Sequence, residues 1–375
     1  MESLPDHRTC DYRTMTGASE WASVGERVRE ARVAARLSQD ELGQQLALDR
    51  TMIAKIEAGR RRLDALELIK LSTALGVPVD HFLREPPQVM SRRARVAGDY
   101  VTDAAQDQYR LEATLQAWLR DVRQLIELDV LQPPPVLRYQ GKVQDKAGAR
   151  EAARWLRDQL GIGTEPIGTL MEVCERAGQL VLVTELPGDG ASLVDGDVAV
   201  AVVSKSGDPG RRRATGAHEL GHLVLADEYS TDLGISTSRD DREAVIDAFA
   251  AELLLPTAVV AQAHVTREKL IHLAATYRTS WSTAIHQAVH AECLDRQVAT
   301  RLRQNNPTHA EIMDALGWAP QPDLESVRVP PSYARGAMRA WRQNKLTWPR
   351  LVEMMHGQLT DEDLPPAEPD AEVEP

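Results

Sequence analysis

The segment His218-Glu219-Leu220-Gly221-His222 places two histidines four residues apart with a glutamate beside the first. On a helix, residues i and i+4 lie on one face, so both imidazoles can bind one cation. A catalytic zinc ion also needs a third protein ligand and a position left open for water. Glu219 is then suited to take a proton from that water as it attacks a peptide carbonyl. The alternative is an ordinary amphipathic helix with two exposed histidines.

The third ligand is expected from the next helix, which is predicted over residues 242–255 and is ended by Pro256. This helix offers three carboxylates, Glu243, Asp247 and Glu252. Glu243 and Asp247 are four residues apart and share a face, so both can point toward the histidines. Glu252 is rotated away from Glu243 by roughly 180° at 3.6 residues per turn. The spacing therefore favours Glu243 or Asp247 and disfavours Glu252.

A second chemistry is indicated near the N-terminus, where short helical segments alternate with polar breaks. Ser38 and Glu41 have the spacing of a capping box, which marks a helix start. Asp49 is the expected N-cap of a short helix over residues 50–57, and Gly59 is expected to end it in the left-handed conformation. Two short helices joined by a tight turn form the geometry with which proteins enter the major groove of DNA.

The second of these helices presents Arg50, Thr51 and Lys55 outward in this interpretation. An arginine can donate two hydrogen bonds to guanine, and a lysine gives a point charge to a base or a phosphate. The basic residues Arg60 and Arg61, in a run that extends to Arg62, are suited to phosphate contacts. The alternative is a small helical bundle that has no role on DNA.

The chain is long enough, at 375 residues, for two or three domains. Its net charge is −12, yet residues 21–97 hold 14 Lys and Arg against 10 Asp and Glu, which leaves +4 there and −16 elsewhere. The three cysteines are far apart, which argues against a thiolate zinc site and fits a reducing cytoplasm. No apolar run approaches the roughly 18 residues of a membrane span, and no signal-peptide pattern opens the sequence.

The expected organisation is a flexible leader over 1–20, a DNA-binding domain over 21–86, a helical linker over 87–135, a metallopeptidase domain over 136–295, a helical extension over 296–358 and an acidic disordered tail over 359–375. Within the linker, Leu111, Leu115, Trp118, Val122 and Leu125 form a seam at 4,3,4,3 spacing. The seam predicts either a helix packed in a core or a homodimer contact. The prolines of the segment QPPPV, residues 132–136, break this helix and predict a domain boundary.

The N-terminal segments resemble a known regulator family. LSQDELGQQLALDRTMIAKIEAGRR resembles the helix-turn-helix core of Cro/XRE repressors, and LELIKLSTALGVPVDHFL resembles their last two helices. The resemblance implies a five-helix domain that binds double-stranded operator DNA. It also implies that Gln39 anchors to a phosphate and that Arg50, Thr51 and Lys55 face the bases.

The segments RRRATGAHELGHLVL and EAVIDAFAAELLLP resemble ImmA/IrrE zinc metallopeptidases. This resemblance implies a zincin-like α+β domain with a small sheet, in a protein that is mainly α overall. It implies Zn²⁺ bound by His218, His222 and Glu243, with Glu219 as the general base. Asp247 stands where the family usually has Asn, and it either adds negative charge near the metal or orients a ligand histidine.

Together the motifs predict a cytoplasmic, DNA-binding transcriptional regulator that carries a zinc-dependent endopeptidase. Its protein target is expected to be a repressor, the chain itself or a cognate toxin, and no membrane is involved. The alternative is a non-enzymatic repressor or antitoxin whose zinc domain serves as a structural, sensing or partner-binding module. Glu219 discriminates the two hypotheses, because only the peptidase needs the general base. Tyr229 and His290 are the residues considered for stabilising the oxyanion.

Overall fold

The computed structural model describes residues 17–77, 79–83, 89–93, 101–226, 236–262, 265–318 and 322–363. The chain forms two compact units, residues 1–86 and 87–375. Most of the predicted leader and of the predicted acidic tail, and Tyr229, lie outside the described residues. The division at residue 86 coincides with the end expected for the DNA-binding domain.

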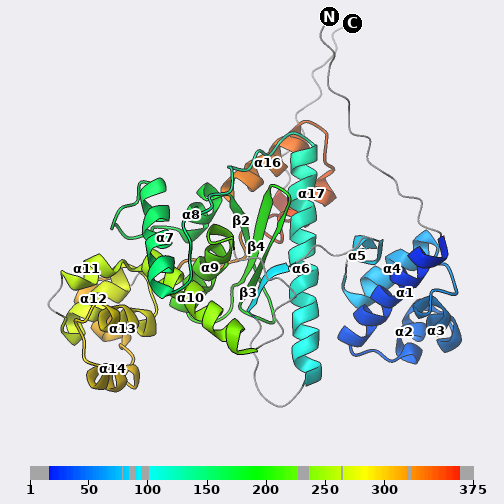
Figure 1. Ribbon diagram of the computed structural model, residues 1–375. Coiled ribbons are helices and arrows are strands. Elements are labelled where there is room, and N and C mark those ends of the chain that lie inside the picture. Colours follow the sequence, from blue (N-terminus) through cyan, green and yellow to red (C-terminus); the bar gives the residue numbers. More distant parts are fainter. Residues whose placement is uncertain are drawn as a thin grey trace, which may run out of the picture. The chain divides into compact units, whose positions relative to one another are not determined.

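The first unit consists of five helices, as the sequence predicted: α1 (Gly17–Ala34), α2 (Gln39–Leu46), α3 (Arg50–Glu57), α4 (Ala65–Leu75) and α5 (Val79–Leu83) (Figure 1). The capping box of α2 is confirmed, because the Ser38 side chain accepts from the Glu41 amide and the Glu41 side chain accepts from the Ser38 amide. Gly59 ends the α3 segment with φ +68°, as expected. Asp49 is the N-cap residue of α3, but its side chain makes no capping hydrogen bond.

A buried carboxylate joins the first three helices of this unit. Glu57, at the end of α3, accepts hydrogen bonds from Arg32 of α1 and from Gln39 of α2, the latter at 2.8 Å. Charge-assisted hydrogen bonds of this kind fix orientation more strictly than apolar packing does. The apolar core beneath them includes Leu42 of α2 and Ile53 of α3, which are fully buried. The turn between α2 and α3 is therefore fixed both by these hydrogen bonds and by the apolar core.

The second unit is built on a four-stranded sheet of β1 (Val89–Arg93), β2 (Gln179–Thr184), β3 (Gly190–Asp195) and β4 (Val198–Ser204). The strand order is β1-β3-β4-β2. β3 pairs antiparallel with both of its neighbours, and β2 pairs parallel with β4. The apolar segments QLVLV and DVAVAVV form β2 and β4.

Helices cover both faces of this sheet (Figure 1), because the strands alternate apolar side chains between two cores. Leu180 and Leu182 of β2 belong to the core with α6 (Val101–Glu127), α16 (Pro331–Arg342) and α17 (Trp348–Met354). Val181 and Val183 of β2 belong to the core with α7 (Lys146–Gln159), α8 (Leu170–Arg176), α9 (Pro209–Val224) and α10 (Ser236–Leu254). The HELGH segment lies on α9, directly against the sheet.

Helix α6 is part of this second unit and does not form a separate linker. Its predicted seam is buried against β3, β4 and α16, with Leu111, Leu115 and Trp118 fully enclosed. Trp118 also donates its indole N–H to the Leu180 carbonyl at 2.9 Å. The seam thus packs within the chain, which is the first of the two roles predicted for it. The proline segment at 132–136 connects α6 to the rest of the same unit.

The helices after α10 form a smaller core of their own: α11 (Thr257–Ala261), α12 (Arg267–Thr276), α13 (Trp281–His290), α14 (Arg296–Arg303) and, beside α12, α15 (His309–Leu316). Ile285 of α13 is fully buried, and the Trp281 indole N–H donates to the Leu302 carbonyl at 2.8 Å. Both side chains therefore serve packing. A short 3₁₀ helix over Asp361–Asp363 ends the described chain. Among the helices described, none is long and apolar enough to cross a bilayer.

Candidate metal centre and DNA-binding surface

Helices α9 and α10 bring together the three residues predicted as metal ligands. Nε2 of His218 lies 3.0 Å from Nε2 of His222 and 3.0 Å from Oε2 of Glu243. Nε2 of His222 lies 4.0 Å from the same carboxylate oxygen. The two histidines are buried and Glu243 is half-buried. Within the described residues, these three form the group whose ligand atoms could hold one metal ion.

The spacing of these atoms fits a tetrahedral ion. Ligand atoms about 2.0–2.1 Å from a zinc ion lie roughly 3.3 Å from one another in tetrahedral geometry, and the three separations here are between 3.0 and 4.0 Å. Two imidazole nitrogens and one carboxylate oxygen are also the donor set of many catalytic zinc sites, which leave a fourth position for water. The residues present therefore fit the metal that the sequence predicted.

Asp247 contacts one of the candidate ligands and is not a member of the metal-ligating group found among the described residues. Its Oδ1 lies 2.9 Å from Nδ1 of His218, on the opposite side of the imidazole from Glu243. When Nδ1 donates to Asp247, Nε2 presents a lone pair toward Glu243 and His222. Electron-rich atoms that converge in this way repel one another unless a cation lies among them. Of the two carboxylates that the sequence left open, Glu243 belongs to the candidate metal-ligating group, and Asp247 contacts Nδ1 of His218.

Gly221, inside the HELGH segment, allows α10 to approach α9 closely enough for these contacts. A Cβ atom at Gly221 would lie 2.9 Å from Cγ2 of Ile246 and 3.0 Å from Cδ1 of Phe249, both on α10. Such distances are shorter than ordinary van der Waals contact between carbon atoms. A larger residue would push the helices apart and withdraw Glu243 from the histidines.

Glu219 is fully buried on the face of α9 that packs against the sheet. Its Oε2 accepts a hydrogen bond from the Ser192 hydroxyl of β3 at 2.7 Å, and Gln179 of β2 donates to its backbone carbonyl at 3.0 Å. Its second carboxylate oxygen, Oε1, is buried and has no hydrogen-bond partner among the described residues. A carboxylate held at one oxygen and free at the other can still accept a proton at the free oxygen.

Ser192, the hydrogen-bond partner of Glu219, was missed by the sequence interpretation because β3 was not predicted. The signal was present in the segment from Gly190 to Val203, where a Gly196-Asp197 turn joins two extended runs. A short Gly- and Asp-containing turn between apolar runs is typical of a β-hairpin. β3 itself is rich in small residues, which weakens its strand pattern.

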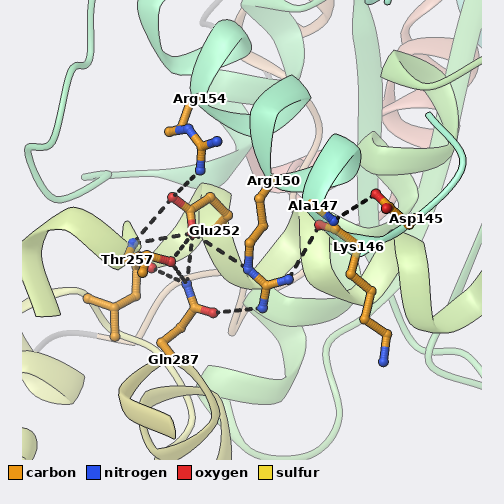
Figure 2. Close-up of polar contacts among 9 residues, drawn as sticks. Asp145, Lys146, Ala147, Arg150, Arg154, Glu252, Thr257 and Gln287 are labelled. Atoms are coloured by element: carbon orange, nitrogen blue, oxygen red, sulfur yellow. Dashed lines mark hydrogen bonds and ion pairs between the residues drawn. The ribbon is translucent and has the colours of Figure 1, made fainter. Parts of the chain in front are cut away.

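Glu252 points away from the metal ligands, as its helical rotation predicted, and lies in a buried network with α7, α11 and α13 (Figure 2). Its carboxylate lies 3.3 Å from Nη1 of Arg154 and 3.9 Å from Nε of Arg150. Gln287 donates to it at 3.1 Å, and the Thr257 amide and hydroxyl also donate to it. Burial lowers the pKa of Arg150, and Glu252 opposes that shift.

Neither residue considered for the oxyanion gains support from the described contacts. Tyr229 lies outside the described residues. The charged neighbours of His290 are Arg150 and Arg154 of α7, Glu252 near the end of α10, and Glu292 in the turn after α13. Burial and Arg150 both lower the pKa of His290. It is absent from the metal-ligating group in the described part of the chain.

A cleft of about 1100 Å³ opens beside Asp247, between α10 and the first turns of α9 on one side and α12 and α13 on the other. Small side chains of α10, among them Ala244, Ala248 and Ala251, form part of its wall. Asp189 and Arg211, which form an ion pair at 2.6 Å, line it near the start of α9. The second unit therefore has a cavity large enough for several residues of a peptide next to the residue that orients His218.

In the first unit, the residues predicted to face DNA divide into two groups. Arg50, Thr51, Lys55 and Arg60 are exposed, and within the described residues none of the first three has a side-chain hydrogen bond or ion pair. Arg61 is different, because it forms a two-pronged ion pair with Glu67 at 2.6 and 3.0 Å.

This pair raises the pKa of Arg61 and lowers that of Glu67, through the hydrogen bonds between them. Gln39 is likewise engaged, by Glu57. A contact of Arg61 or Gln39 with phosphate would require these internal bonds to be shared or broken.

Comparison with known proteins agrees with both parts of the chain. Residues 28–82 match the helix-turn-helix family, and residues 174–289 match the family described as an IrrE N-terminal-like domain. The chain thus contains a Cro/XRE-type helix-turn-helix domain followed by an IrrE N-terminal-like domain, as predicted. The second match includes α9, α10 and the strands β2, β3 and β4 beside them.

The curated relatives match a short part of the chain. An uncharacterised transcriptional regulator in the ATPase CF(0) region of Rhodospirillum rubrum is 39% identical over 64 residues, which is 17% of this chain and 59% of that protein. An uncharacterised helix-turn-helix regulator of Sinorhizobium medicae is 38% identical over 64 residues, 17% of this chain and 46% of that protein. The chain thus spans about half the length of these curated relatives.

Among solved structures, the restriction-modification controller protein C.AhdI of Aeromonas hydrophila is 31% identical, with a TM-score of 0.18, over 18% of this chain and 99% of that one.

Proposed function

We propose that this helix-turn-helix regulator with an IrrE-type, peptidase-like domain is a zinc-dependent endopeptidase of narrow specificity. Its cleavage of a protein target switches the expression of genes whose operator the first unit binds. The observation that carries the proposal is the convergence of His218, His222 and Glu243 within bonding distance of one ion, one residue away from a buried glutamate. A domain kept only for its fold would need neither the convergent ligands nor that glutamate.

The residues of the second unit divide the work of peptide hydrolysis. His218, His222 and Glu243 hold the metal, and Asp247 fixes the ring of His218 so that Nε2 faces it. A zinc ion at this position supplies Lewis acidity, which makes water nucleophilic at neutral pH. Glu219 accepts the proton of that water at Oε1 and passes it to the amide nitrogen of the leaving peptide. Ser192 donates a hydrogen bond to the other carboxylate oxygen, Oε2, and so keeps Oε1 oriented toward the water.

The first unit determines which DNA sites the protein binds. Exposed Arg50 and Thr51, at the start of α3, and exposed Lys55 are proposed to face bases in the major groove. Arg60 is proposed to contact a phosphate, with Gln39 and Arg61 contributing once they exchange their partners Glu57 and Glu67. Operator binding implies that the protein acts in the cytoplasm, where bacterial DNA lies.

The protein target is proposed to be a repressor, the chain itself or a cognate toxin. Each of these would connect proteolysis to transcription, because removal of a DNA-binding protein relieves repression. General degradation of proteins is disfavoured, since sequence-specific DNA binding would serve no purpose for it. A homodimer on a palindromic operator is compatible with this function.

The test compares wild type with Glu219→Gln in the native cell. The size of this protein and of the products of neighbouring genes is followed by immunoblot, with transcript levels from its own promoter, before and after DNA damage or phage challenge. We expect a fragment and derepression in the wild type alone, with equal zinc content in both proteins. Identical cleavage patterns would overturn the peptidase and favour a non-enzymatic repressor or antitoxin.

A further inference from the structure

Strand β1 connects the two units in sequence and forms one edge of the sheet in the second. It pairs antiparallel with β3, so that Ser91 lies opposite Ser192 and Arg93 lies opposite Gly190. β1 also contacts α9, the helix that carries the HELGH segment. An extended stretch of the chain between the two units therefore runs beside the candidate metal centre.

The residues of β3 opposite β1 are the ones that touch the proposed general base. Ser192 donates to Oε2 of Glu219 at 2.7 Å. A Cβ atom at Gly190 would lie 3.6 Å from Cγ of Glu219 and 2.8 Å from Cγ2 of Thr215, so only glycine lets the strand approach α9 this closely. Adjacent strands are separated by about 4.8 Å. The β1 backbone is thus one strand spacing from the side chain and backbone that hold Glu219.

Two further observations distinguish this part of the sheet. Oε1 of Glu219 is buried and lacks a hydrogen-bond partner among the described residues, which is costly unless a ligand or water completes it. The pairing of β1 is irregular between Val89 and Ser91, whose partners Leu193 and Ser192 are consecutive residues. The extra residue, Met90, is a bulge outside the regular ladder. Val89 and Ser91, on either side of Met90, remain paired with β3.

An extended peptide that adds a strand to a sheet edge is a common mode of peptide recognition. Here the added strand belongs to the same chain. We propose that β1 is the peptidase's own substrate and that the hydrolysed bond is Met90–Ser91. This inference rests on the function proposed above and selects the chain itself among its three targets.

The reaction consumes one water molecule and balances without any other reactant. The C–N bond between Met90 and Ser91 breaks, the carbonyl carbon of Met90 gains the hydroxyl, and the nitrogen of Ser91 gains the proton carried by Glu219. The products are an N-terminal piece that holds α1 to α5 and a C-terminal piece that holds α6 to α17. Cleavage thus separates the DNA-binding unit from the peptidase unit.

The experiment uses the full-length protein, prepared without metal and then given zinc chloride. Intact mass spectrometry should detect two fragments whose masses add up to the 41.5 kDa chain plus one water, and N-terminal sequencing of the larger should begin at Ser91. Because the reaction is intramolecular, its half-time should not change on tenfold dilution. Glu219→Gln should stay intact although it binds zinc.

Two proline variants provide a matched pair. Ser91→Pro removes an amide within β1, which should weaken its pairing with β3 and abolish the cut. Ala97→Pro changes the same interdomain segment outside β1 and should be cut like the wild type. Hydrogen exchange at Gly190–Leu193 reports separately whether β1 remains paired.

The outcomes separate this inference from the proposed function. A β1 that stays paired and uncut in the zinc-loaded protein would overturn the inference, as would a cut elsewhere or a rate proportional to concentration. If Glu219 is nevertheless required to cleave another protein in the cell, the proposed function stands. If wild type and Glu219→Gln behave alike toward every protein, including this one, both fail.

Discussion

Asp247 and His218 are joined through Nδ1 of the imidazole, with Oδ1 of the carboxylate 2.9 Å away. His218 is fully buried and half of the Asp247 side chain is exposed, so the pair connects the metal centre with the cleft beside it. Carboxylates that accept from the outer nitrogen of a ligand histidine fix its tautomer and increase its basicity. The negative charge at position 247 is thus directed at a ligand rather than at the metal.

This relationship predicts that Asp247→Ala weakens metal binding while leaving the three ligands in place. Loss of such a supporting carboxylate typically costs about 10–100-fold in affinity. Asp247→Asn should cost less, because its amide oxygen can still accept from Nδ1. Competition with a chromophoric zinc chelator measures all three proteins. Equal affinities for wild type and Asp247→Ala would show that the contact does not support the site.

The ligand assignment predicts a different pattern for the neighbouring residues. His218→Ala and Glu243→Ala should each lose the metal, because two protein ligands are too few for a stable zinc site. Glu219→Gln should retain it, because Glu219 faces Ser192 and the sheet. Metal content is measured by atomic absorption after gel filtration. Equal zinc in the three variants would remove the assignment altogether.

The sequence predicted the ligands because their spacing is local. His218 and His222 share a helix face in any fold that keeps this helix. The choice of a third ligand was narrowed to two residues on the next helix, Glu243 and Asp247. The choice between Glu243 and Asp247 depends on how α10 is rotated against α9, which is a tertiary property. Ser192 was missed for a related reason, since its contact with Glu219 joins residues 27 positions apart on different elements.

Elements with a strong apolar periodicity were predicted from the sequence. Elements that form only because they pair with a neighbouring strand were missed. The five helices of the first unit were expected, and the seam of α6 was recognised. β1 has no apolar alternation and exists through its pairing with β3. The proline segment at 132–136 ends α6, yet its residues pack within the second unit, since proline stops a helix without separating domains.

Gly221, inside the HELGH segment, should be sensitive to substitution. Gly221→Ala introduces a Cβ atom 2.9 Å from Ile246 and 3.0 Å from Phe249, which should cost about 1–3 kcal/mol of unfolding free energy. It should also weaken zinc binding, because α10 carries Glu243. Gly168→Ala is the control, since nothing lies within 4 Å of its Cβ position. Urea unfolding and zinc titration of both variants test this prediction, which fails if Gly221→Ala matches its control.

Glu252 should matter for stability and not for the metal. Glu252→Gln removes the charge that faces buried Arg150, and breaking a buried ion pair typically costs about 3–5 kcal/mol. Zinc affinity should be unchanged, because Glu252 contacts α7, α11 and α13 instead of the histidines. Glu243→Gln is the counterpart, with weakened zinc binding and little loss of stability from packing. Chemical unfolding with a chelator present separates the two effects, and a zinc defect in Glu252→Gln would contradict this interpretation.

On DNA, three of the arginines predicted to contact it should behave differently. Arg50→Ala should weaken operator binding by about 1–3 kcal/mol and relax the base preference, because exposed Arg50 opens α3 and is proposed to read a base. Arg60→Ala should weaken binding to all sequences alike and reduce the salt dependence by about one phosphate contact. Arg61→Ala should change affinity less than Arg60→Ala, since Arg61 is already paired with Glu67.

Binding titrations on operator and scrambled DNA at several salt concentrations separate the three. If specificity is unchanged in Arg50→Ala, Arg50 does not contact the bases; if Arg61→Ala has the largest salt effect, its ion pair opens on DNA.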